Sequence, residues 1–291
     1  MPTPSPTLAG SLRRTVFFLS DFGLHDEFVG IVHAVIAARA PGATVVDLTH
    51  DVAPFDVRAG SRTLVRAVPH VGSGVVLGVV DPGVGTARRG IAIAVALAPG
   101  ETLYFVGPDN GLLVAAAEVA GEAPVSRVVR LERPERPERP EGTTELGATF
   151  DGRDLFAPAV AALCNGATLE ELGAEVDPGS LVRLPGGVVE HGRAPDGRSL
   201  LRAEVTWVDR FGNVELAATT LDARAAGMPS EGAVALDPGL VLRRVQAFGD
   251  LDREELGLLV DASGSLAVVA REASAARRLN AGVGDLLVLS W

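Results

Sequence analysis

The chain of 291 residues contains no lysine, one cysteine and few aromatic residues. All 26 basic residues are arginine, which excludes Schiff-base catalysis, lysine-bound pyridoxal phosphate and a Walker-type phosphate loop, since each needs an amine. The lone Cys164 follows a helix-like apolar run and permits no internal disulfide and no cysteine-based metal site. No apolar run is long enough to span a membrane, and residues 1–14 lack the apolar stretch of a secretion signal. We therefore expect a disordered tail over residues 1–14, no membrane association and a cytoplasmic location.

The remaining composition is that of a globular protein. Hydrophobic residues make up 47% and charged residues 22%, so the core can be sizeable, and the length suits one large domain or two ordinary ones. A formal net charge of −11 argues against a nucleic-acid partner.

Short apolar strands alternate with helical patterns through the first two thirds of the chain. Strands are expected over residues 15–19, 44–48, 75–80, 91–97 and 102–106, and helices over 26–40, 57–68, 112–120 and 155–164. This alternation predicts an α/β domain with a mainly parallel sheet over residues 15–184. The repeat ERPERPERPE at 132–141 predicts an exposed low-complexity loop. Glycine, proline and short strands dominate residues 185–291, which predicts a smaller all-β domain.

Charged side chains gather where the predicted strands end. Asp21 follows the first strand, and Asp81 and Arg88 follow the apolar strand over 75–80. A dense cluster, Asp151 to Asp154, precedes the helix over 155–164. Ligands of open α/β sheets bind outside the carboxyl ends of strands, so these groups are candidates for a ligand site. The alternatives are a helix cap at Asp21 and an ordinary turn around Asp81. Within the second domain, VDRFGNV at 208–214 combines an acid, an aromatic and an amide, with a plain hairpin turn as its alternative.

Five motifs in this order resemble one family over nearly the whole chain from residue 15: LSDFG, VVDPGVGTARR, VGPDNGLL, TFDGRDLFAP and VDRFGNV. The chain is similar to the S-adenosylmethionine hydroxide adenosyltransferases, relatives of the fluorinating and chlorinating enzymes. The resemblance implies a C-terminal β-barrel and a homotrimer, with the ligand between one subunit's N-terminal domain and its neighbour's C-terminal domain. It also implies hydrolysis of S-adenosylmethionine at ribose C5′, giving adenosine and L-methionine without a metal or cofactor.

The resemblance assigns the chemistry to three residues. Arg88 would stabilise the developing hydroxide, Asp81 would orient Arg88, and Asp151 stands where the family pattern Phe-His-Gly-Arg-Asp has histidine. A carboxylate can act as a general base, but its charge repels hydroxide, so we expect Arg88, Arg89 and Arg153 to set the balance around it. None of the five histidines lies in this motif; His25, near the Asp21 motif, could substitute spatially, although an exposed side chain is the expected reading. The alternative is a protein that binds adenosine or S-adenosylmethionine without turnover.

The resemblance also assigns the binding residues. Asp21 would grip the ribose hydroxyls, Asn213 would contact the adenine edge, and Asp209 would pair with the methionine ammonium. Further binding positions are Phe55, Phe211 and Phe248, whose rings would lie against adenine, and Ser263 in the ASGS stretch near the methionine carboxylate and adenine. A halogenase is less favoured, because the halogenating relatives carry tyrosine where this chain has Asp81, and a carboxylate would repel halide.

Overall fold

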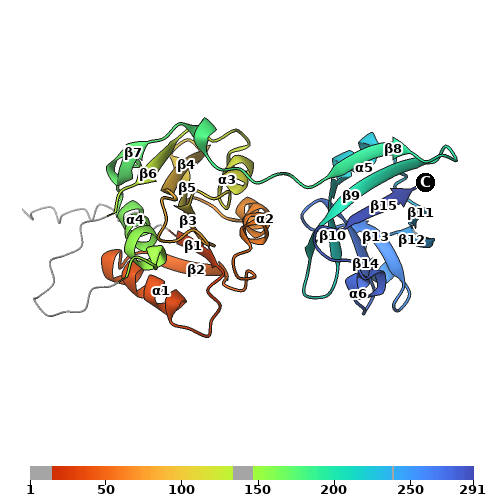
Figure 1. Ribbon diagram of the computed structural model, residues 1–291, viewed down its shortest axis with the longest axis horizontal. Helices are drawn as coiled ribbons and strands as arrows, with labels where there is room; N and C mark the ends of the chain where they lie inside the picture. The colour runs from red at the N-terminus through yellow and green to blue at the C-terminus, as the bar shows by residue number, and fades with distance from the viewer. Residues whose placement is uncertain (1–14, 134–146, 238) are drawn as a thin grey trace, which may run out of the picture. The chain divides into compact units, whose positions relative to one another are not determined.

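The computed structural model describes residues 15–133, 147–237 and 239–291, and its chain divides into two compact units between Leu184 and Pro185 (Figure 1). The expected tail over 1–14 and most of the expected loop at 132–141 lie outside the described residues. Each unit has its own core, so each is described by itself.

The first unit is built on a seven-stranded sheet in the order β2-β1-β3-β5-β4-β6-β7. The half formed by β2, β1, β3 and β5 is parallel, and β4, β6 and β7 add antiparallel pairings. The predicted α/β class with mainly parallel strands is confirmed. The strands are β1 (Thr15–Ser20), β2 (Thr44–Thr49), β3 (Gly74–Val79), β4 (Gly90–Ala98), β5 (Glu101–Pro108), β6 (Val128–Leu131) and β7 (Gly173–Glu175).

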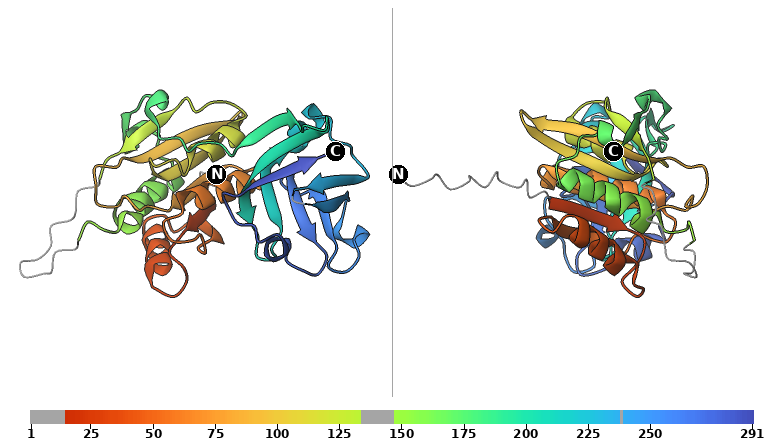
Figure 2. Two further views of the ribbon diagram at one scale, coloured as in Figure 1. Left: turned by 45° about the vertical axis from the view of Figure 1, so that its right-hand side comes forward. Right: turned by 90° about the vertical axis from the view of Figure 1, so that its left-hand side faces the viewer.

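Two pairs of helices cover the two faces of this sheet. The helices α1 (Phe28–Arg39) and α4 (Ala157–Cys164) lie on one face, and α2 (Val57–Ala67) and α3 (Val114–Gly121) lie on the other (Figures 1 and 2). Every residue of β3 is buried, as its run of β-branched residues predicts for a central parallel strand. Gly78 leaves room for the residue just before α3, since a Cβ there would come within 2.9 Å of the Leu113 side chain. Single turns lie at Val68–His70, Gly152–Phe156, Glu170–Leu172 and Pro178–Ser180.

The second unit is a closed barrel. Seven strands run β10-β14-β13-β12-β11-β15-β9 and close through the β9–β10 pairing, while β8 pairs with β9 outside the ring. All pairings are antiparallel except that of β12 with β13. Its elements are β8 (Val189–Arg193), β9 (Ser199–Val208), β10 (Val214–Thr219), α5 (Thr220–Ala225), β11 (Ala233–Leu236), β12 (Leu240–Arg244), a turn at Phe248–Asp250, β13 (Leu256–Val260), β14 (Ser265–Ala270), α6 (Ala275–Leu279) and β15 (Leu286–Ser290). The expected barrel-like fold is confirmed.

The helices of both units are short. Among the described residues, no helix is both long and apolar enough to cross a membrane.

Candidate active site

Three loops meet at the carboxyl ends of the parallel strands. Ser20 at the end of β1 pairs with Val79 at the end of β3, so the loops that carry Asp21 and Asp81 begin side by side. The next loop, after β5, is tied to them by Asn110, whose Nδ2 donates to the carbonyl of Val80 at 2.8 Å. The sheet topology therefore creates the strand-end ligand site that the sequence predicts.

Arg88 joins the two predicted catalytic carboxylates. Its Nη2 donates to Oδ2 of Asp81 at 2.5 Å and to Oδ2 of Asp151 at 2.7 Å. The Arg88 side chain is only 9% exposed, and its guanidinium lies 5.4 Å from the centre of the buried Phe156 ring. The structure thus brings together all three residues to which the resemblance assigns the chemistry.

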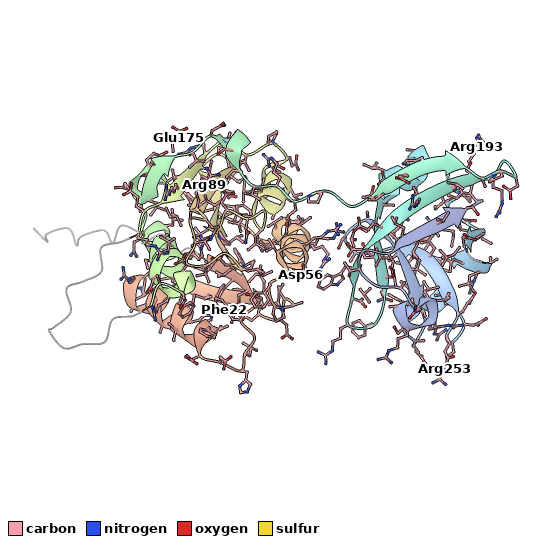
Figure 3. The ribbon with its side chains drawn as sticks, in the orientation of Figure 1. Phe22, Asp56, Arg89, Glu175, Arg193 and Arg253 are labelled. Atoms are coloured by element: carbon pink, nitrogen blue, oxygen red, sulfur yellow. The ribbon has the colours of Figure 1, made fainter. Side chains whose placement is uncertain are left out.

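Asp151 is buried and held by a second arginine that the sequence analysis missed. Its Oδ1 accepts a hydrogen bond from Nη2 of Arg133 at 2.6 Å, so both carboxylate oxygens contact guanidinium groups. Asp151 directly precedes the π-helical turn Gly152–Phe156, a geometry often found at functional sites. The aromatic ring of Phe150 packs edge-on against Phe22, labelled in Figure 3, with ring centroids 5.8 Å apart. This contact fastens the segment before Asp151 to the loop after β1.

The expected roles of two other arginines were wrong. Arg89 instead pairs with Asp109 and donates to Oγ and the carbonyl of Ser180, and Arg153 pairs with the adjacent Asp154 at 2.7 Å. Neither contacts Asp151, because Asp109 holds the guanidinium of Arg89 and Asp154 holds that of Arg153. His25 is exposed, as the preferred reading of the sequence predicts.

The Asp81–Arg88 pair retains unused polar atoms. Burial raises the pKa of Asp81 above its ordinary value, although the nearby Arg88 guanidinium opposes that shift. Within the part of the chain that the structure describes, Oδ1 of Asp81 and both Nε and Nη1 of Arg88 are buried without a hydrogen-bond partner. A buried acceptor beside two buried donors suits a small polar reactant such as water.

Asp21 and Phe55 form the second group of predicted residues in this unit. Oδ2 of Asp21 accepts the backbone N–H of Phe55 at 2.8 Å, so Asp21 fastens another loop and does not cap the helix that follows it. Phe55 has a φ of 68°, unusual for a residue with a side chain, and the residue is 72% exposed. Asp21 therefore holds the backbone of Phe55, and among the described residues its Oδ1 has no hydrogen-bond partner.

Four predicted binding residues line one cavity of about 890 Å³ in the second unit: Asp209, Phe211, Asn213 and Phe248. Asp209 organises the loop, because its Oδ1 accepts the N–H groups of Phe211 and Asn213, both at 2.9 Å. Its Oδ2 accepts Nδ2 of Asn213 at 2.7 Å. The hairpin-turn alternative thus describes the backbone correctly, while Phe211 remains 77% exposed beside the cavity.

Ser263 lies elsewhere. It is exposed in the turn between β13 and β14, where its N–H donates to Oδ1 of Asp261 at 2.8 Å. Ser263 is not among the described residues that line the 890 Å³ cavity.

Comparison with known protein families shows to which family the chain belongs. Residues 16–173 match the SAM hydroxide adenosyltransferase N-terminal domain, and residues 203–288 match the C-terminal domain of the same family. The chain belongs to the SAM hydroxide adenosyltransferase family. Both matched regions fall within the units that the structure separates.

Individual members of the family are similar over most of the chain. An (R)-S-adenosyl-L-methionine hydrolase of Salinispora tropica is 42% identical over 272 residues, which cover 94% of this chain and 96% of that protein. A protein of the same name from Thermus thermophilus is 45% identical over 209 residues, covering 72% and 74%. A fluorinase of Nocardia brasiliensis is 27% identical over 96% of this chain and 97% of its own.

A solved structure also matches. The crystal structure of an uncharacterised conserved protein from Thermotoga maritima superposes with a TM-score of 0.80 at 31% identity, covering 94% of this chain and 99% of that one. The fold of this family member is therefore shared by a solved structure along nearly its full length.

Proposed function

We propose that the protein hydrolyses S-adenosylmethionine, releasing adenosine and L-methionine. The observation that carries this proposal is the similarity to proteins named (R)-S-adenosyl-L-methionine hydrolase, at 42% identity along 94% of the chain. The buried Asp81–Arg88–Asp151 cluster at the strand ends supplies the polar groups that such a reaction needs.

The reaction is a nucleophilic substitution in which one bond replaces another. The oxygen of water bonds to ribose C5′ while the bond from C5′ to sulfur breaks, and the sulfonium takes that electron pair and leaves as the neutral thioether of methionine. One proton of the water must pass to a base. Because the leaving group needs no protonation, the protein's task is to position the water, accept its proton and stabilise negative charge on its oxygen.

The contacts assign different tasks to the two carboxylates. Asp81 orients Arg88 through Oδ2, while its unpartnered Oδ1 accepts the water's proton. Asp151 holds Arg88 from the other side, and Arg133 compensates its charge. The unpartnered N–H groups of Arg88 then stabilise the developing hydroxide. In this proposal Asp151 is a positioning residue, in contrast to the general-base role considered from the sequence.

Substrate binding divides between the two units. Asp21 offers a free carboxylate oxygen to the ribose hydroxyls, and Phe55 offers one face for adenine. Asn213 retains its Oδ1 for the adenine edge, and Asp209 receives the methionine ammonium. Phe211 and Phe248 complete the aromatic surface at the cavity, and Ser263 remains a candidate contact for the methionine carboxylate and adenine.

We also propose a homotrimer in which a site combines the first unit of one copy with the second unit of its neighbour. The test uses two variants, Asp81→Asn and Asn213→Ala, each of which we expect to lose most of its activity by itself. Co-expression restores activity if a site takes one half from each copy, because some sites then contain two intact halves. Absence of restored activity in mixed oligomers would refute the shared site.

The reaction is tested with purified protein and S-adenosylmethionine in water enriched in heavy oxygen, without halide. We expect adenosine that carries the heavy isotope at its 5′ oxygen, measured by mass spectrometry. Binding of adenosine without any product would instead support the non-catalytic alternative. Added fluoride or chloride should give no halogenated nucleoside, since the Asp81 carboxylate repels halide. The cytoplasmic location stays a prediction.

A further inference from the structure

Two histidines and an aspartate meet on the opposite side of β1 from the Asp81 strand. Nε2 of His33, on α1, lies 2.8 Å from Oδ1 of Asp47 on β2, and Nε2 of His50, just after β2, lies 3.0 Å from the same oxygen. The three donor atoms all lie within 4.8 Å of one another. Asp47 and His50 are three residues apart, but His33 precedes Asp47 by 14 residues on a separate helix, so the sequence spacing did not reveal the full set. We propose that His33, Asp47 and His50 bind a divalent transition-metal ion of the Zn²⁺ class.

The surroundings of His50 suit this residue for metal binding. The residue is only 5% exposed, and its Nδ1 lies 2.7 Å from Oγ of Ser20, the last residue of β1. Metal-bound histidines commonly donate their second ring N–H to such an oxygen, which leaves the other nitrogen with a free lone pair. The same Oγ accepts the N–H of Phe22 at 3.3 Å, so its orientation is constrained from two sides.

Nε2 of His50 is buried and lacks a hydrogen-bond partner among the described residues. Its distance of 3.0 Å from Oδ1 of Asp47 would permit a hydrogen bond, but the two groups are not aligned for one. A cation bound between this nitrogen and the carboxylate oxygen would accept the lone pair and satisfy the buried polar atom.

The spacing and the donor types fit this class of ion. Ligands at about 2.0–2.2 Å in a tetrahedral site lie about 3.3 Å apart, so the distances of 2.8 and 3.0 Å must open by only a few tenths of an ångström. The side chains of His33 and Asp47 are 35% and 40% exposed, which gives them freedom to adjust and gives water access as a fourth ligand. Two imidazoles with one carboxylate favour Zn²⁺, Co²⁺ or Ni²⁺ over the oxygen-seeking Mg²⁺ and Ca²⁺.

The ion would fasten three segments and take no part in hydrolysis. Helix α1 contributes His33, β2 contributes Asp47, and His50 is linked to the end of β1 through Ser20. The carbonyl of His50 also accepts the N–H of Gly23, two residues after Asp21, at 2.8 Å. Metal binding would therefore stabilise the loop that carries the predicted ribose contact.

The test uses untagged, metal-stripped full-length protein titrated with Co²⁺ and, separately, Zn²⁺. We expect one ion per chain by calorimetry, the intense visible bands of low-coordinate Co²⁺, and a melting temperature that rises with metal concentration. His33→Ala removes a partly exposed ligand and should weaken binding by about 100-fold while the fold is kept. Ser20→Ala should weaken it by about 10-fold or more, the usual effect of losing a partner that orients a ligand.

His70→Ala is the matched control, because His70 is an exposed histidine outside the cluster. It should bind Co²⁺ as the unchanged protein does. Equal affinities of the unchanged protein and His33→Ala, a matching loss in His70→Ala, or no binding at all would each overturn the proposed site. A spectrum of fully hydrated Co²⁺ would overturn it as well. Circular dichroism of each variant separates loss of a ligand from loss of the fold.

Discussion

Replacing Asp81 by asparagine should abolish the general base without destabilising the fold. The amide has the same shape, but it cannot accept the water's proton and it carries no charge for Arg88, which Asp81 now contacts at 2.5 Å. Because burial raises the pKa of Asp81, its ionised form is less favourable in the folded chain than in the unfolded one. Removing that charge should therefore leave the thermal stability unchanged or raised.

The expected loss of activity is large. General-base catalysis contributes about 10²–10⁴-fold to rates, and a misoriented Arg88 adds to the loss, so kcat should fall by about 10³-fold, or about 4 kcal/mol. Asp151→Asn should cost less, about 10–100-fold, because the amide keeps one oxygen for a guanidinium. Its unfolding free energy should fall by about 3 kcal/mol, since Asp151 is 3% exposed and paired with two arginines.

Adenosine release measured by chromatography gives kcat and KM, and thermal unfolding gives the stability of each variant. Asp109→Asn is the control, because Asp109 is also a buried aspartate paired with an arginine, Arg89, at the end of a neighbouring strand. It should lose stability with a much smaller loss of kcat. Asp81→Asn with more than a tenth of the normal kcat, or a greater loss in Asp151→Asn, would refute the assignment and make Asp151 the base.

Four further predictions concern pH and the second unit. Because the pKa of Asp81 is raised above 3.8, the loss of kcat at acid pH should begin at a higher pH than it would with an ordinary aspartate as the base. Measuring kcat and circular dichroism at each pH tests this, since the spectra show whether the protein is still folded. The stability contribution of the same group is present below 3.8 and is lost as the pH rises through the raised value. Phe211→Ala should raise KM by about tenfold, the effect of losing one stacking ring, without lowering the melting temperature, because Phe211 is 77% exposed. Gly212→Ala should weaken nucleoside binding in calorimetry and destabilise the unit by about 1–3 kcal/mol, since Gly212 has a φ of 86° and a Cβ there would overlap Ser274.

Much of the fold follows from local patterns. The run over residues 75–80 predicts a buried strand because its residues are apolar and β-branched, and β3 occupies Gly74–Val79. The strand β7 was missed, since Gly173–Glu175 has only three residues and no apolar alternation. Its strand character comes from pairing with β6, and such tertiary pairing leaves no periodic pattern in the sequence.

The candidate site was likewise predicted only in part. The sequence predicted that charges would gather at strand ends, because topology places those ends together. It could not predict the partners of each charge: Arg133 belongs to a repeat that reads as an exposed loop, yet it contacts Asp151. Similarly, Arg89 pairs with Asp109 and Arg153 pairs with Asp154, and neither pairing was predicted. Side-chain pairing depends on distances of a few ångströms, which motif order does not determine.

Closure of the β9–β10 pairing limits how the second unit can meet other chains. A strand inside the ring has hydrogen-bonding neighbours on both sides, so it presents no continuous free edge for sheet extension. The outer strand β8 has a free side, but it is short, exposed and charged, with Glu190 along it and Arg193 at its end (Figure 3). Such an edge resists pairing with other strands and so protects the unit against edge-to-edge aggregation. Contacts between copies would then rely on side chains, such as the exposed Phe211, and not on shared strands.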